Sequence, residues 1–253
     1  MGTNKIALIT GGSRGLGKNA ALHLAKKGID VIVTYRSKKE EAETVVADIE
    51  SMGQKAAALQ LDTGIVSTFD AFITELKATL NEKWGRETFD FLINNAGIDA
   101  ASTFAKTTEE DFDNLFNVHF KGVYFLTQKS LPVIADGGRI INFSTGLARF
   151  STPGYAAYAS MKGAIEVFTK YLAKELGSRG IAANVVAPGI IQTDFTKAAF
   201  DSHPGLEERM SQSTALGRVG QPDDIGGVVA FLCTEDARWI NAQRIEASGG
   251  MFL

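Results

Sequence analysis

The sequence predicts an α/β fold in which a doubly wound parallel sheet carries helices on both faces. Short apolar runs alternate along the chain with longer segments of helical periodicity, which is the rhythm of consecutive β-α-β units. The runs are rich in Ile, Val, Leu and Phe without clean two-residue alternation, as expected of strands covered on both faces. No linker rich in Pro, Gly or Ser divides the chain, so residues 1–253 are expected to form one domain.

The individual elements follow from these runs. Buried strands are expected at Lys5–Thr10, Asp30–Tyr35, Ala56–Leu61, Phe89–Ile93, Arg139–Phe143 and Ile181–Val186. Helical patterns lie at about 15–28, 38–52, 65–83, 108–135 and 154–178. A further helix is expected at about 222–233, because Pro222 suits a first helical turn and two aspartates lie near its positive end. Arg244–Ala247 is the candidate for a last short strand.

The charge distribution argues against a nucleic acid partner and against a membrane span. The chain has 26 Lys and Arg against 29 Asp and Glu, and no basic run exceeds two residues. A surface that neutralises phosphates needs a clustered basic face. The longest stretch without a charged side chain is the 14 residues from Gly180 to Thr193, which Pro188 interrupts. A membrane span needs roughly 20 apolar residues.

The cysteine and histidine content indicates a cytoplasmic protein without a metal site. The one cysteine, Cys233, cannot form an internal disulfide, which is compatible with a reducing compartment. Gly11 and Gly12 fall within the first dozen residues, so we expect no secretory signal. The three histidines are scattered and give no metal-ligand spacing.

A glycine-rich turn follows the first expected strand and opens the first helix. Its sequence is Thr10-Gly11-Gly12-Ser13-Arg14-Gly15-Leu16-Gly17. Glycines at such a turn let the backbone approach a pyrophosphate, and the helix N-terminus supplies amides and partial positive charge. The alternative is a merely tight turn, but the position after the first strand favours dinucleotide binding.

The end of the second strand indicates which nicotinamide cofactor is preferred. Tyr35-Arg36 stands where a reader of the ribose 2′-hydroxyl would place Asp or Glu. A guanidinium attracts a 2′-phosphate, and Arg14 is placed to approach the same group. We therefore expect NADP(H) to be preferred, with NAD(H) possible. The alternative is that both arginines are solvated surface residues.

Two further motifs are expected at the carboxyl ends of later strands. Asn94-Asn95-Ala96-Gly97 follows the fourth strand, where ligands bind in doubly wound sheets; its asparagines can tie neighbouring strands or contact the nucleotide. Tyr158 and Lys162 lie four residues apart on one helical face. A nearby cation lowers the pKa of a phenol and makes it a usable general acid or base. Thr145 or Ser144, at the end of the fifth strand, could meet Tyr158 at the sheet edge.

Taken in order, these motifs resemble those of the short-chain dehydrogenase/reductase family, in particular its single-domain members of the 3-oxoacyl-acyl-carrier-protein reductase type. The resemblance covers essentially the entire chain. It rests also on the segments Pro188–Thr193 and Gly217–Pro222. It implies a Rossmann fold with a seven-stranded sheet in the order 3-2-1-4-5-6-7, a small carbonyl or alcohol substrate, and a homotetramer.

The resemblance also implies roles for individual residues. Tyr158 corresponds to the proton donor, and Lys162 to the residue that lowers the tyrosine pKa and holds the nicotinamide ribose. The substrate-orienting serine of the family stands thirteen residues before the tyrosine, which is Thr145 here, with Ser144 as the fallback. Cofactor contacts are implied for the glycine turn (Gly11, Ser13, Arg14, Gly15, Leu16 and Gly17), for Tyr35, Arg36, Asp62, Asn95, Ala96 and Gly97, for Tyr158 and Lys162, and for Pro188, Gly189, Ile191 and Thr193.

One position departs from the family pattern. The family has Asn followed three residues later by Gly in its long fifth helix, and this chain has His119-Phe120-Lys121-Gly122. His119 is interpreted as a structural residue that fastens a helix bend; the alternative is that its imidazole carries protons. The segment at about 193–217 is expected to form a substrate lid. The alternatives for the whole chain are a catalytically silent NADP(H)-binding sensor and a longer type of nucleotide-sugar enzyme, for which 253 residues leave no room.

Overall fold

The computed structural model describes residues 4–99 and 101–253. Its centre is one sheet in the order β3-β2-β1-β4-β5-β6-β7, and every pairing between neighbouring strands is parallel. This confirms the predicted fold class and strand order. The strands are β1 (Ile6–Ile9), β2 (Asp30–Tyr35), β3 (Ala56–Gln60), β4 (Phe89–Asn94), β5 (Ile134–Phe143), β6 (Ala182–Pro188) and β7 (Arg244–Ala247).

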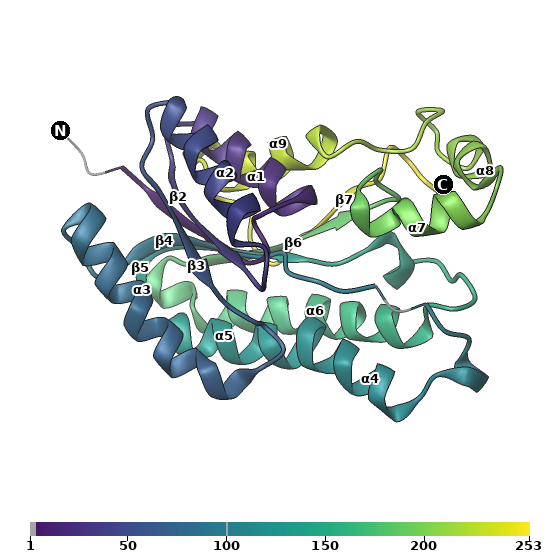
Figure 1. The fold of residues 1–253 in the computed structure, drawn as a ribbon, viewed down its shortest axis with the longest axis horizontal. Helices are drawn as coiled ribbons and strands as arrows, with labels where there is room; N and C mark the ends of the chain where they lie inside the picture. Colours follow the sequence, from purple (N-terminus) through teal and green to yellow (C-terminus); the bar gives the residue numbers. More distant parts are fainter. Residues whose placement is uncertain (1–3, 100) are drawn as a thin grey trace.

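Helices cover both faces of the sheet (Figure 1). One face carries α1 (Gly15–Lys26), α2 (Lys39–Ser51) and α9 (Asp223–Leu232). The other carries α3 (Phe69–Trp84), α4 (Glu109–Phe116), α5 (Gly122–Ser130) and α6 (Ala156–Glu175). Two short helices, α7 (Asp194–Ser202) and α8 (Leu206–Gln212), lie beyond the sheet near the C-terminus. They occupy the segment that the sequence suggested as a lid.

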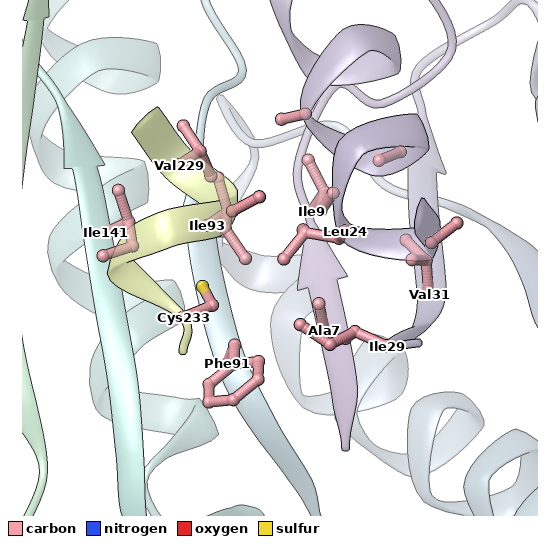
Figure 2. Close-up of a cluster of buried hydrophobic side chains, with 14 of the residues drawn as sticks. Ala7, Ile9, Leu24, Ile29, Val31, Phe91, Ile93, Ile141, Val229 and Cys233 are labelled. Carbon is pink, nitrogen blue, oxygen red and sulfur yellow. The ribbon is translucent and has the colours of Figure 1, made fainter. Parts of the chain in front are cut away.

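Successive strand residues feed two separate cores, which explains the apolar runs. Ala7 and Ile9 pack beneath α1 and α9, whereas Ile6 and Leu8 pack on the opposite side with α3 and α6. Figure 2 shows the first of these cores, with Cys233 at the end of α9 set among residues of β1, β4 and β5. Both faces of each central strand exclude water, so a polar side chain at every second position would be buried there. Burying such polar groups without hydrogen-bond partners would destabilise the fold.

The prediction of one continuous helix at 108–135 is wrong in two respects: the helix is interrupted, and it ends earlier than expected. The structure has α4, then a π-helical turn at Asn117–Lys121, then α5, which ends at Ser130. Pro132 explains the end, because proline lacks the amide that an α-helix needs and disfavours a helical residue before it. The turn coincides with a close approach at Gly122, where a side chain would collide with the main-chain oxygen of Thr63. β5 consequently starts five residues earlier than Arg139.

Candidate active site

The glycine-rich turn has the backbone geometry that a closely approaching ligand needs. Gly11 and Gly15 adopt positive φ angles of 64° and 56°, which favour glycine. A Cβ on Gly17 would collide with the main-chain oxygen of Gly11. Arg14 occupies the N-cap position of α1, and its side chain makes no capping hydrogen bond. The first backbone amides of a helix have no partner within the helix, so here they are left for a ligand at the turn. These features fit a dinucleotide pyrophosphate.

Asn94, the last residue of β4, and Asn95 after it bond to neighbouring parts of the fold rather than reaching outwards. Asn95 donates from Nδ2 to the main-chain oxygens of Thr10 and Gly11, at 2.9 and 3.1 Å. The Thr10 hydroxyl in return accepts from the amides of Asn95 and Ala96, each at 3.0 Å. Asn94 donates to Asn142 across β4 and β5 at 2.8 Å. Of the two roles open from sequence, tying neighbouring strands is the one these bonds serve.

The residues expected near the ribose 2′-position lie at the carboxyl ends of β2 and β3. Tyr35 is half-buried at the end of β2, and Arg36 beside it is exposed. Arg14 is also exposed, and its guanidinium lies 3.8 Å from Asp194 at the start of α7. Asp62 accepts from the Gly64 amide at 2.9 Å. Two exposed guanidiniums therefore lie at the edge where the adenosine half of a dinucleotide would bind.

The segment after β6 returns to the same edge. Pro188 ends β6, and the Gly189 amide donates to Ala247 of β7 at 3.2 Å. Ile191 is buried and bridges to Gly220. Thr193 begins α7 through a reciprocal capping arrangement with Thr196. These contacts fix the start of α7 against the sheet.

The predicted catalytic pair lies on α6, beside the end of β5. Lys162 is buried and donates from Nζ to the main-chain oxygen of Phe143 at 2.9 Å. Its ammonium is 5.7 Å from the centre of the Tyr158 ring. Burial lowers the pKa of Lys162 to about 8. The lysine thus gives up its proton more readily than one in water.

The pKa of Tyr158 differs from the expectation that the neighbouring cation lowers it. Burial raises this pKa well above its usual value, and the negative charge of Asp99 and the proximity of Tyr155 raise it further. In the protein alone, desolvation therefore outweighs the distant ammonium. Asp99 and Tyr155 were not found from sequence; Tyr155 could have been, since it lies one helical turn before Tyr158.

Ser144 and Thr145, the two residues that follow β5, face different surroundings. The Ser144 hydroxyl is buried and donates to Glu166 Oε1 at 2.7 Å. Thr145 is less buried, and its hydroxyl accepts from the Leu147 amide at 3.3 Å. That weak local bond leaves the threonine hydroxyl better placed than the serine to meet another group.

His119 lies in the π-helical turn, against the catalytic tyrosine. Its ring is edge-on to Tyr158 with centroids 5.0 Å apart, and it is almost fully buried. Nε2 lies 2.8 Å from the main-chain oxygen of Ile98, so it carries the proton as a donor. Nδ1 has no hydrogen-bond partner in the described part of the chain. Burial, together with the Lys162 charge, lowers the pKa of His119 to about 3.

Within residues 4–99 and 101–253, no group of three or more His, Cys, Asp or Glu side chains is arranged to hold a metal ion. No helix of those residues is both long and apolar enough to cross a membrane.

A Rossmann-type sheet, a glycine turn at the first strand and a Tyr-Lys pair at the fifth define a nucleotide-dependent oxidoreductase class. The family profile described as enoyl-(acyl carrier protein) reductase matches residues 11–252. The chain belongs to the short-chain dehydrogenase/reductase family.

Several relatives match the chain over nearly its full length. It is 37% identical over 255 residues to the 3-oxoacyl-[acyl-carrier-protein] reductase of Staphylococcus aureus, covering 100% of both chains. It is 39% identical to an uncharacterized oxidoreductase of Methylorubrum extorquens, covering 98% of this chain and 97% of that one. Among solved structures, the angucycline C-6 ketoreductase LanV with bound NADP has a TM-score of 0.92 at 39% identity, covering 98% and 95%.

We expect substitutions of His119 to affect folding stability more than turnover. His119→Asn should stay close to wild type in kcat, and His119→Ala should lose stability because the bond to Ile98 disappears. The unfolded chain takes up the His119 proton near pH 6.5 and the folded protein near pH 3. Wild type should therefore lose about 1.4 kcal/mol more stability per pH unit than His119→Asn as the pH falls below 6.5.

Denaturant unfolding between pH 7 and 5 measures this difference, and kcat against pH is measured for all three proteins. The structural interpretation fails if wild type shows a pH-rate inflection that the asparagine variant lacks, with a loss of about 10²–10⁴ in kcat for alanine.

Proposed function

We propose that this protein is an NADP(H)-dependent reductase of a small-molecule ketone, with Tyr158 as the proton donor. The observation that carries the proposal is the phenol of Tyr158, whose ring centre lies 5.7 Å from the buried Lys162 ammonium, at the strand edge that the glycine turn shares. A phenol keeps its proton at neutral pH and can donate it to a carbonyl oxygen as that oxygen gains charge. The Lys162 ammonium would favour this step, because a nearby cation stabilises the phenolate that forms.

Each residue of the site has a distinct task in the proposed reaction. The bound nicotinamide would supply the hydride. Thr145 Oγ1 would donate to the substrate carbonyl oxygen and fix its orientation, and Tyr158 would pass its hydroxyl proton to that oxygen. The Lys162 ammonium would stabilise the phenolate left behind and bind ribose hydroxyls. The backbone oxygen of Phe143 holds the ammonium in place through its 2.9 Å bond.

Two observations support NADP(H) over NAD(H). Arg14 and Arg36 are exposed at the end of the sheet where the ribose would lie, and the end of β2 carries Tyr35 rather than a carboxylate. Similar proteins have been solved with NADP, including LanV and a Burkholderia cenocepacia short chain dehydrogenase, which is 34% identical.

The substrate class follows from relatives rather than from the pocket itself. LanV and LugOII are described as a ketoreductase and a reductase that catalyses keto-reduction, and both match nearly the whole chain at about 40% identity. We therefore propose a ketone as the substrate. We also propose that the protein works in the cytoplasm, because a single, buried free cysteine is compatible with a reducing compartment.

We also propose that the protein assembles with copies of itself, as a homotetramer. Large apolar side chains are exposed on α4, α5 and α6: Phe112, Tyr124, Val167 and Tyr171 are between 38% and 63% exposed. An apolar patch of this kind is typical of an interface. Light scattering of the purified protein measures the assembly directly.

Tyr158→Phe should nearly abolish turnover while leaving NADPH affinity within a few-fold. The ring still packs against His119, but no proton can be delivered, which costs about 10²–10⁴ in rate. Initial rates on a panel of ketones and alcohols, with fluorescence titration of NADPH, test this. More than half of the wild-type kcat in the variant would show that Tyr158 is not the acid. A wild-type protein that binds NADPH without turning over any of the panel would instead favour the silent sensor.

Thr145→Ala should reduce kcat more than Ser144→Ala does. The threonine hydroxyl is the less engaged of the two, whereas the serine is bonded to Glu166. The two variants each remove one hydroxyl from adjacent residues and so serve as matched controls. The reverse order of kcat values would move the orienting role to Ser144.

Tyr35→Asp should shift the ratio of kcat/KM values towards NADH. The new carboxylate would repel a 2′-phosphate and accept from a 2′-hydroxyl. Tyr35→Asn introduces a side chain with the shape of aspartate but without its charge, and it should shift the ratio less. Arg36→Ala should weaken the binding of NADPH further. If wild type already prefers NADH, the two arginines have no part in the choice.

A further inference from the structure

A chain of ion pairs runs from α6 through β7 to the segment after β5. Arg244 of β7 donates from Nε to Glu166 Oε1 at 2.6 Å and from Nη1 to Glu246 Oε2 at 3.0 Å. Arg149 donates from Nη2 to the other oxygen of Glu246 at 2.8 Å. The four side chains are only 21% to 36% exposed. Carboxylates and guanidiniums thus alternate, and each inner member has a partner on both sides.

This chain of ion pairs holds both ends of the segment 145–149. At one end, Arg244 Nη2 donates to the main-chain oxygen of Thr145 at 3.0 Å. At the other, Arg149 donates to the main-chain oxygens of Met251 and Phe252, at 2.5 and 3.2 Å. The segment that begins with Thr145 is therefore fastened to β7 and to the end of the chain.

Glu166 connects the same network to the catalytic helix. It lies one turn after Lys162 on α6 and accepts the Ser144 hydroxyl at 2.7 Å. Glu166 Oε1 thereby accepts two hydrogen bonds, one from the Ser144 hydroxyl and one from Arg244 Nε. Ser144 precedes Thr145, and Arg244 holds the Thr145 backbone. Charge-assisted bonds in partly buried positions are among the stronger ones in proteins.

The donor geometry of Arg244 requires arginine. Three of its nitrogens reach three different acceptors: Glu166, Glu246 and the Thr145 main chain. The rigid planar fork of a guanidinium supports this arrangement, whereas an ammonium is a point donor on a flexible stem.

We propose that Arg244 is a positioning residue for the reduction, which holds the backbone of Thr145 so that its hydroxyl meets the substrate carbonyl. This inference rests on the proposed function, in which Thr145 orients the substrate. A misplacement of about 1 Å caused by a change away from the reacting atoms can cost 10²-fold in rate.

The first test compares Arg244→Met with Arg179→Met. Arg179 offers a control because its guanidinium also reaches three acceptors, here the Asp136 carboxylate and the main-chain oxygens of Leu131 and Ile134, near the start of β5. We expect Arg244→Met to lower kcat by about tenfold or more with NADPH affinity within about twofold, and Arg179→Met to leave kcat unchanged. Arg244→Lys should restore only part of the loss.

The second test asks whether the effect passes through Thr145. In a Thr145→Ala background, single-turnover rates should fall less than about threefold when Arg244→Met is added, because the hydroxyl to be positioned is gone. Glu166→Gln keeps the shape of the side chain and removes its charge. It should also lower kcat, but by less than Arg244→Met does. Thermal unfolding of each variant separates a folding defect from a positioning defect.

Three results would overturn the inference: equal kcat values for Arg244→Met and Arg179→Met, full rescue by lysine, or independent, multiplicative losses with Thr145→Ala. They are distinguishable from failure of the proposed function. If Tyr158→Phe retains turnover, the proposed function falls; if Tyr158→Phe is inactive while Arg244→Met is fully active, only this inference falls.

Discussion

Parallel pairing of the seven strands is the constraint on which the whole candidate site depends. Because every strand runs the same way, the carboxyl ends of β1, β2, β4, β5 and β6 meet at one edge of the sheet. The glycine turn, the asparagines after β4, Thr145 and the start of α7 all follow those ends. Two local features of the site are unusual: the positive φ angles of Gly11 and Gly15 in the turn, and the π-helical turn that carries His119.

Buried polar groups keep the central strands in register where apolar packing alone would permit slippage. Asn94 donates to Asn142, which donates to Thr169 on α6 at 2.9 Å, so one hydrogen-bonded chain crosses β4 and β5 to reach the catalytic helix. Each member is buried, and an unpaired buried amide would cost about 1–3 kcal/mol. The same helix carries Lys162 two turns earlier, so this polar chain also fixes the height of the catalytic pair relative to the sheet.

Local patterns predicted the strands well and the long-range contacts poorly. β2 has the predicted limits, because its apolar run is bounded by polar residues. The break in the helix after Phe116 coincides with the close approach of Gly122 to Thr63, 59 residues earlier in the chain, which no local pattern records. The partner of Glu166 on β7, Arg244, is likewise 78 positions away. The elevated pKa of Tyr158 depends on burial and on Asp99, which only the folded chain brings near.

The position of Cys233 gives the molecule a built-in reporter of its own opening. The thiol is the one cysteine in the sequence, is 5% exposed at the end of α9, and burial raises its pKa to about 12. A thiolate is therefore scarce and shielded in the folded state, and labelling reagents can reach it only when α9 separates from the sheet. The rate of labelling, with and without a bound nucleotide, would then measure how strongly the ligand holds this layer closed, with no need to introduce a cysteine.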